Sequence, residues 1–447
     1  MLDNAPIGCF YSLFGLKRGK SHAAPTKVVA NEDALPDYED CVVSSSFIPA
    51  EKQTEAERIV AEAIEAASPS LRKLSKQIHE HPEIRWTEVY AHDHLTDYME
   101  KAGFKVTRHA YGMKTAFIAE CECGEGGPSI GFCSEYDALP GVGHGCGHNL
   151  IAISGVASAI GLRAALEQLN LSGKITLFGT PAEEANGGKI DLINKGAFDK
   201  MDVCMMLHPA NADGIYIKML ALDQVYVEYY GRPAHAAASP WEGINALDAM
   251  VQAYSGLAML RQQTPTTHRV HGIIVDGGKA SNVIPDYTRG EFTVRAPTRA
   301  ELEIFKAKVV NVFEAAAQAT QCKVKLTWGR PYYDVIQNNP LCQHFEKYMV
   351  REGVKYLPRY EQESAAHGST DMGNVSYIKP SAHPCFDIGT TVPLHTKEFA
   401  QAAITPEAHQ RCLRASRSMA LTMMDVVSDP KLLAAVKEDF EKATKAF

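Results

Sequence analysis

The sequence predicts an α/β protein in which a mostly parallel-sheet domain carries an inserted ferredoxin-like module. Short apolar runs that end in polar residues first alternate with helical segments. The order then changes to β-α-β-β-α-β over about a hundred residues, after which the first pattern resumes. With 447 residues the chain is too long for one ordinary core. In parallel sheets ligands bind beyond the carboxyl ends of the strands, so those ends are where we look for a site.

Composition narrows the class of protein. Hydrophobic residues make up 45% and charged residues 22%, as in ordinary globular proteins. The net charge of -8 argues against a nucleic-acid partner, which needs clustered basic residues. Eleven cysteines, an odd number, indicate a reducing compartment, and we expect the cytoplasm. We find no apolar run of the ~18–20 residues that span a bilayer, so we expect no membrane partner.

The N-terminal part is expected to be helical after a leading tail. Residues 1–55 lack sustained periodicity and predict a tail or a surface strap. Apolar residues at threes and fours predict helix from Glu55 to Ile78, split in two at Ser68-Pro69. A further helix, 88–102, ends at Gly103.

Four strands are predicted in the first part of the catalytic domain, which we place at 56–221. Their ranges are 115–121, 129–133, 174–179 and 203–207. A buried helix is expected from Leu150 to about Leu169. Polar residues follow the last three strands: Cys146 and His148, then Glu183 and Glu184, then His208.

The inserted module is expected at 222–330 and the second part of the catalytic domain at 331–447. The module's strands are predicted at 224–230, 269–275, 287–296 and 323–328, with helices at 245–261 and 300–320. Beyond it, a strand at 385–388 precedes His395, and two helices close the chain.

Thiol, imidazole and carboxylate groups at the strand ends predict a hydrolytic metal site. Cys146 and His148 are two residues apart, so on an extended segment both would leave the same face and could bind zinc. Taken singly, a Glu-Glu pair is usually a solvated face, and a lone histidine is usually an interior packing residue. Together at strand ends they favour a metal hydrolase with Glu183 as the general base. The following residues supply five ligands, enough for two ions: Cys146, His148, Glu184, His208 and His395.

Seven ordered motifs between about residues 70 and 425 resemble the aminoacylase/carnosinase-type co-catalytic metallopeptidases. Within that family they are most similar to the amidohydrolase branch, with its dipeptidase and aminobenzoyl-glutamate hydrolase members. The motifs are Ile78-His79 with Pro82-Glu83, Glu135-Tyr136-Asp137-Ala138-Leu139-Pro140, His144-Gly145-Cys146-Gly147-His148, Pro181-Ala182-Glu183-Glu184, Gly231 with Ala234-His235-Ala236, Asn282-Val283-Ile284-Pro285-Asp286, and His395 before Phe399.

The resemblance implies roles for several residues. The five ligands would hold two divalent ions, preferably Zn²⁺ with Mn²⁺ as the alternative, and Asp137 would orient the site. The module would be a lid and dimerisation domain of a homodimer. From it, His235 would reach the partner's active site and stabilise the oxyanion. Asn282 and Arg295 would bind substrate, although an ion pair is an equal reading of Arg295.

Two positions depart from the family's pattern. Many relatives have histidine where Glu135 stands, which removes a possible ligand, and aspartate where Asn149 stands, which changes what orients His148.

We therefore expect hydrolysis of the amide bond of a small N-acyl amino acid or dipeptide. Two alternatives stay open at this point. One is a biosynthetic enzyme that forms an amide on a specialised acyl-amine, and the other is a non-catalytic zinc-bound scaffold.

Overall fold

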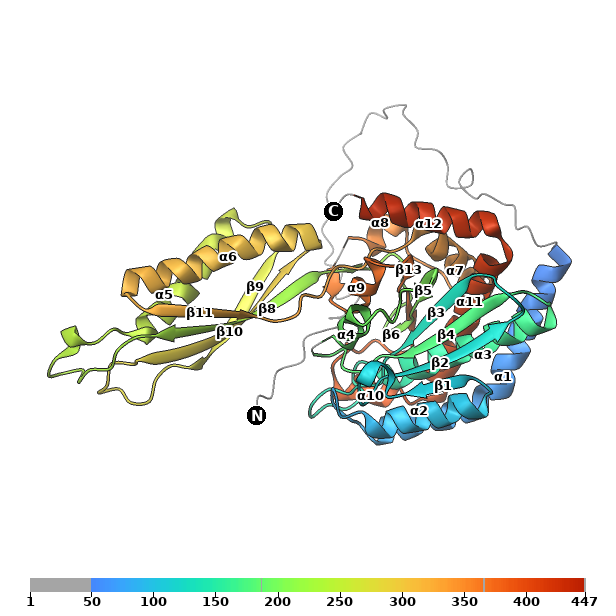
Figure 1. The fold of residues 1–447 in the computed structure, drawn as a ribbon, viewed down its shortest axis with the longest axis horizontal. Coiled ribbons are helices and arrows are strands. Elements are labelled where there is room, and N and C mark those ends of the chain that lie inside the picture. Colours follow the sequence, from blue (N-terminus) through green and yellow to red (C-terminus); the bar gives the residue numbers. More distant parts are fainter. Residues whose placement is uncertain (1–49, 186, 365, 446–447) are drawn as a thin grey trace, which may run out of the picture.

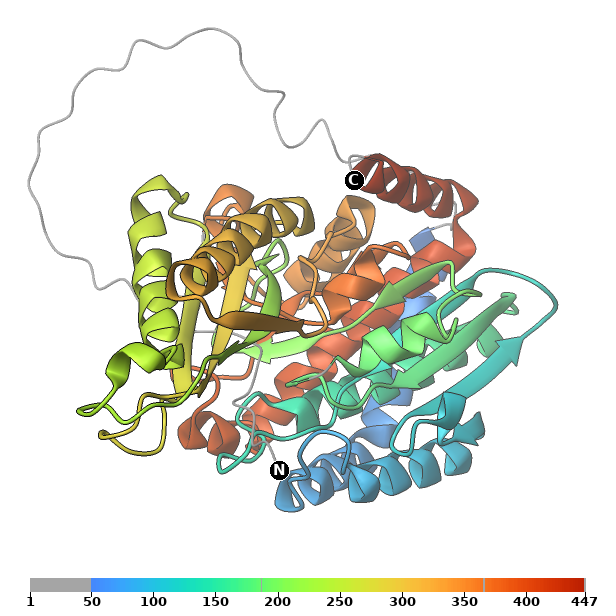
Figure 2. The ribbon, with the colours of Figure 1, turned by 60° about the vertical axis from the view of Figure 1, so that its left-hand side comes forward.

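The chain folds into an α/β body and a lid that extends from one end of it (Figures 1 and 2). This computed structural model describes residues 50–185, 187–364 and 366–445. The predicted tail, 1–55, lies outside these residues apart from its last six, which begin the first helix. The body is built from the two ends of the described chain, and the lid from the middle.

The body contains a six-stranded sheet in the order β1-β2-β4-β3-β5-β13. The strands are β1 (Lys105–Arg108), β2 (Phe117–Cys123), β3 (Ser129–Ser134), β4 (Gly173–Gly179), β5 (Val203–Met205) and β13 (Ser381–Ala382). β3 is parallel to both β4 and β5, and β13 is parallel to β5. β2 is antiparallel to β1 and β4, so within this sheet it runs against the other strands. The mostly parallel sheet is confirmed, and its central strands β4, β3 and β5 end side by side.

Two short parallel pairs and a set of helices complete the body. The short pairs are β6 (His208–Ala210) with β14 (Cys385–Asp387), and β7 (Lys218–Met219) with β12 (Ala366–Gly368). The helices are α1 (Ala50–Glu80), α2 (Val89–Lys101), α3 (His148–Gln168), α4 (Gly188–Asn194), α7 (Asn339–Arg351), α8 (Arg359–Gln362), α9 (Met372–Ser376), α10 (Lys397–Ala402), α11 (Pro406–Ser428) and α12 (Pro430–Thr444).

The sheet is buried on both faces. Ile130 and Phe132 of β3 pack into the larger core, which α1, α2, α3, α7 and α11 complete. Cys133 of the same strand points into a second core, which includes residues of α4 and α9. Burial of successive residues on opposite faces explains why these strands are continuously apolar.

α3 is the central helix of the larger core. The helix is 21 residues long, and its most apolar stretch of 18 residues has a mean hydropathy of 1.5, so by length and composition it could cross a membrane; 83% of that stretch is buried. Our expectation that no run reaches this length was therefore wrong. Within the described residues, α3 packs between α1, α11 and the sheet as a core helix.

α1 is continuous through the predicted break at Ser68-Pro69. Pro69 lies inside the helix, and that prediction was wrong. Ser68 is buried, and its hydroxyl lies 3.1 Å from Nε2 of His409 in α11. The apolar face of α1, including Ile64 and Leu71, is fully buried on both sides of the proline. This packing provides the stability that keeps one helix despite a proline in its interior.

The lid has the predicted β-α-β-β-α-β order and the ferredoxin-like fold. Its sheet has the order β11-β8-β10-β9, which leaves β9 at an edge. The elements are β8 (Ala221–Tyr230), α5 (Ala246–Met259), β9 (Arg269–Asp276), β10 (Tyr287–Ala296), α6 (Arg299–Thr320) and β11 (Lys323–Trp328). The side chains of Asn245 and Thr298 cap α5 and α6. Phe292 and Phe313 pack in a core separate from those of the body.

The lid is tied to the body where the chain enters and leaves it. Leu222 and Tyr332 exchange two backbone hydrogen bonds of 2.9 Å. Arg295 of β10 donates a hydrogen bond from Nη1 to Ser369 Oγ of the body, at 2.9 Å. Backbone pairing and a side-chain contact thus join the two parts.

Candidate metal centre

The loops that follow β3, β4 and β5 converge at the carboxyl edge of the sheet. They carry Glu135 to His148, then Glu183 and Glu184, then His208. Because β4, β3 and β5 are neighbours and parallel, these loops lie together. His395 arrives from the loop after β14, and its backbone N–H donates to Gly145 O at 2.8 Å. Four segments distant in sequence thus meet at one place.

Cys146 and His148 converge through a turn rather than along the extended segment that we had expected. Gly147 has a φ of 78° and precedes the first residue of α3, His148. A Cβ at Gly147 would lie 2.6 Å from Pro209 Cγ, so a larger residue would collide there. Glycine is needed for both the left-handed backbone and the close approach.

Hydrogen bonds and a close backbone approach hold the segment that carries Glu183 and Glu184. Ala182 has a φ of 59°, unusual for a residue with a side chain, and its N–H donates to Glu88 Oε1 at 2.9 Å. Tyr332 donates its hydroxyl to Glu183 O at 2.7 Å. A Cβ at Gly188 would lie 1.9 Å from Pro181 O, so glycine closes this loop. Backbone strain of this kind is characteristic of functional sites.

The side chains at this place form three overlapping groups whose potential ligand atoms lie within 4.8 Å of one another. The groups are Cys146, His148 and His208; Cys146, Glu184 and His395; and Glu135, His148 and Glu183. Cys146 Sγ lies 3.5 Å from His208 Nε2, and Glu184 Oε1 lies 3.7 Å from Nε2 of both His148 and His395. A tetrahedral zinc ion with bonds of about 2.0–2.3 Å holds its ligand atoms roughly 3.3–3.8 Å apart. The observed separations fit that geometry closely.

Buried polar atoms at the centre support a bound cation. Among the described residues, the buried side-chain atoms without a hydrogen-bond partner include one atom from each of four residues whose ligand atoms cluster here. They are Glu135 Oε2, His148 Nε2, Glu184 Oε1 and His395 Nε2. Buried polar atoms are normally satisfied, so this convergence requires an explanation, and metal coordination provides one.

The pKa values of two carboxyls and two imidazoles point the same way, whereas at His148 burial is outweighed by Cys146 and Asp137, which raise its pKa well above the usual range. Burial raises the pKa of the Glu184 carboxyl to about 8 and that of Glu183 well above its ordinary value. Burial also lowers the pKa of His395 to about 4 and holds that of His208 well below its usual range. Neutral imidazoles are the metal-binding form, and divalent cations would supply the positive charge that clustered carboxylates need.

Asp137 connects two of the predicted ligands. Its Oδ1 lies 3.1 Å from His148 Nδ1, and its Oδ2 accepts the Glu184 backbone N–H at 2.9 Å. Burial opposes ionisation of Asp137, but the hydrogen bond with His148 holds its pKa below the usual range. Nε2 of His148 is thereby directed at the centre, as in carboxylate–histidine–metal arrangements.

Asn149 hydrogen-bonds elsewhere, and Asp137 is the residue that contacts Nδ1 of His148. Nδ2 of Asn149 donates to Ser75 Oγ at 2.9 Å and to Ala403 O at 3.2 Å. These two hydrogen bonds tie α3 to α1 and to the segment that follows α10.

The sequence analysis missed a buried ion-pair cluster beside the centre. Lys189 Nζ contacts Glu135 Oε1 and donates to Asp371 Oδ1 at 2.6 Å, and all three side chains are fully buried. Glu135, which we had counted only as a lost ligand, therefore lies within the centre. A single lysine in the first turn of a short helix carries no sequence signal, because buried lysines are rare and usually occur only when paired.

Two of the predicted lid residues, His235 and Asn282, are exposed on the surface of the lid. His235 and Asn282 are adjacent: Ala236 N donates to Asn282 O at 3.0 Å. His235 Nδ1 accepts from the N–H groups of Ala237 and Ala238, at 3.2 and 3.1 Å. Because Nδ1 accepts these hydrogen bonds, the proton of the neutral ring lies on Nε2, and the exposed His235 can act as a donor there.

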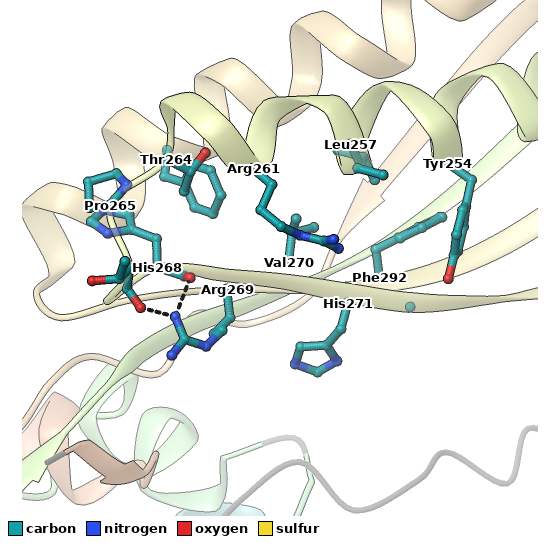
Figure 3. A pocket seen from close by; sticks show the side chains of 14 residues that line it. Tyr254, Leu257, Arg261, Thr264, Pro265, His268, Arg269, Val270, His271 and Phe292 are labelled. Carbon is teal, nitrogen blue, oxygen red and sulfur yellow. Dashed lines mark hydrogen bonds between the residues drawn. The ribbon is translucent and has the colours of Figure 1, made fainter.

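A cavity of about 480 Å³ lies within the lid, away from the metal centre. Figure 3 shows Leu257 of α5 and Arg261 of the 3-10 turn after it facing Val270 and Phe292 of the sheet. Arg269 donates to His268 O at 2.8 Å on its rim. None of the described residues of the metal centre line this cavity, so it does not bear on the chemistry proposed there.

Comparison with known proteins finds similarity to peptidases and amide hydrolases. A family profile described as a peptidase dimerisation domain matches residues 222–321. The chain is 43% identical to the Xaa-Arg dipeptidase of Mus musculus over 396 residues, which cover 86% of this chain and 92% of that protein. It is 28% identical to a p-aminobenzoyl-glutamate hydrolase component from Escherichia coli, with 87% and 95% covered.

Solved structures share the fold. A dinuclear metal-binding peptidase of the M20 family from Bacillus subtilis aligns with a TM-score of 0.57 at 20% identity, over 78% of this chain and 98% of that one. An aminobenzoyl-glutamate utilization protein from Klebsiella pneumoniae aligns with a TM-score of 0.60 at 20% identity, over 79% and 98%.

Proposed function

The chain belongs to the M20 peptidase family and is a metal-dependent amide hydrolase, and from that premise we propose that it cleaves small dipeptides or N-acyl amino acids with Glu183 as the general base. The observation that carries this proposal is the convergence of buried potential metal-ligand atoms, all within 4.8 Å of one another in each group, from separate segments of the described chain. Such a centre suits the polarisation of a carbonyl and the activation of water.

We assign the ion-holding role to Cys146, His148, Glu184, His208 and His395. Two divalent ions, when bound, would polarise the scissile carbonyl and lower the pKa of a water molecule. Zinc suits a set of thiolate, imidazole and carboxylate ligands, and manganese is the alternative.

Glu183 lies beside this set, in a position to act on substrate. Its Oε2 lies 4.0 Å from His148 Nε2, and the Tyr332 hydroxyl fixes its backbone carbonyl. Its carboxylate would take a proton from the attacking water and return it to the leaving amine nitrogen.

We further propose a homodimer through the lid, in which His235 of one subunit completes the site of the other. β9 is an edge strand whose Ile273, Ile274 and Val275 are 62%, 40% and 47% exposed. Unpaired strand edges and adjacent apolar patches favour association. The dimerisation-domain match covers the same elements. Substrate contacts by Asn282 and Arg295, and a cytoplasmic location, belong to the same proposal.

Dipeptides with C-terminal arginine are the first substrates to test, because Xaa-Arg dipeptidases are 42–43% identical to this chain. Protein stripped by a chelator and reloaded with Zn²⁺ or Mn²⁺ would be incubated with Xaa-Arg dipeptides, N-acyl amino acids and p-aminobenzoyl-glutamate, and free amine would be measured. We expect the highest kcat/KM on Xaa-Arg. Absence of hydrolysis on every amide would contradict the proposal, and amide formation alone would indicate the biosynthetic direction.

A further inference from the structure

Lys189 is a fully buried lysine beside the candidate metal centre. Its backbone N–H donates to Asp371 Oδ2 at 2.9 Å and its Nζ donates to Asp371 Oδ1 at 2.6 Å. One carboxylate therefore holds both the main chain and the side-chain end of the same residue. Burying a charged lysine costs free energy even when it is paired, so a buried lysine at this place calls for a functional explanation.

The other contact of Lys189 leads into the centre. Nζ binds Glu135 Oε1, while Glu135 Oε2 lies 3.5 Å from His148 Nε2. Glu135, His148 and Glu183 form one of the three groups of potential ligand atoms. Since one oxygen is held by Lys189, the other is directed at the side of the centre that His148 and Glu183 share.

We propose that Lys189, anchored by Asp371, is a positioning residue that fixes Glu135 Oε2 against the ion held by His148. The inference rests on the proposed metal centre and adds to it a residue that touches neither ion nor substrate. Without Lys189 the Glu135 side chain would lose the contact that selects its rotamer, and its carboxylate would no longer face His148.

The test measures metal binding rather than turnover. Zinc affinity would be measured on chelator-stripped protein by competition with a chromophoric chelator, and the visible spectrum of the Co²⁺-loaded protein would report ligand geometry. We expect Lys189→Met to lower the affinity for one of the two ions by about tenfold or more and to alter the Co²⁺ spectrum. Substitutions of residues that hold metal ligands in place commonly have effects of this size. Lys189→Arg should restore part of the affinity.

Glu135→Gln separates positioning from general electrostatics. We expect Glu135→Gln to lower the affinity for the same ion. In the Glu135→Gln background, Lys189→Met should cause no further loss of zinc affinity. Additive losses would show that Lys189 acts independently of Glu135 and would overturn the proposal. Should Lys189→Met fail to fold, as circular dichroism would report, Glu135→Gln decides alone, since unchanged zinc affinity would contradict the inference.

A matched control removes a different lysine–aspartate pair. Lys306 Nζ lies 2.7 Å from the buried Asp223 in the lid, so Lys306→Met deletes a comparable contact far from the ions. We expect unchanged zinc affinity. Wild-type protein that binds no divalent ions would instead refute the proposed function, while wild-type binding with an unaffected Lys189→Met would refute this inference only.

Discussion

The metal centre of the body and the proposed catalytic surface of the lid are built in different ways. The centre gathers side chains such as His148 and Glu184 into a buried cluster whose atoms face one another. The lid instead carries His235 and Asn282 on its own surface, with Nδ1 of His235 satisfied by backbone N–H groups. Burial fixes the first site within one chain, whereas in our proposal the second is completed by the surface of another subunit. This difference predicts that substitutions of the metal ligands in the body reduce metal binding. Substitutions on the lid should reduce catalysis and leave metal binding unchanged.

The largest expected effect is that of Glu183→Gln. Loss of a general base costs about 10²–10⁴-fold in kcat, and we expect about a thousandfold or more here. Metal content should be unchanged, since Glu183 is not one of the five assigned ligands. Steady-state kinetics with elemental analysis of the same sample would check both; full turnover would contradict the assigned mechanism.

His235→Ala should reduce kcat by about 10²–10³-fold, as expected for loss of an oxyanion donor. Zinc affinity should not change, because His235 lies on the lid. Mixing His235→Ala with Glu183→Gln protein, after subunit exchange, should restore activity in the heterodimers, where one site has both groups. No recovery in exchanged mixtures would indicate that His235 acts within its own subunit.

Arg295→Met should have a smaller effect, about a tenfold rise in KM with little change in kcat, because a charged contact to substrate contributes about 1.5 kcal/mol. Arg289→Met is the matched control, since Arg289 lies in the same strand and pairs with Glu291. Equal kinetics for Arg295→Met and wild type would favour the structural contact with Ser369 as the role of Arg295.

Phe313→Ala should have the smallest effect on the centre. It removes a buried ring from the separate lid core and should destabilise the lid by about 3–5 kcal/mol in urea unfolding. Phe345→Ala in the body core is the comparison, and there we expect loss of metal binding at lower urea concentration. If both variants released zinc at the same urea concentration, the two regions would unfold as one unit.

The same contrast explains what the sequence could predict. Strand ends with Cys146, Glu183 and His208 were recognisable because apolar strands and polar ends follow the chain locally. The continuity of α1 through Pro69, the role of Asn149 and the burial of Lys189 depend on partners far away in sequence. Local periodicity carries no information on such partners, since tertiary packing overrides local preference.

The central claim is that the buried cluster holds two catalytic ions. Elemental analysis of active protein, purified without added chelator, should give two divalent ions per chain. Chelation should abolish amide hydrolysis, and two equivalents of Zn²⁺ or Mn²⁺ should restore it. One tightly held ion per chain, in protein that hydrolyses amides equally well before and after chelation, would contradict the account.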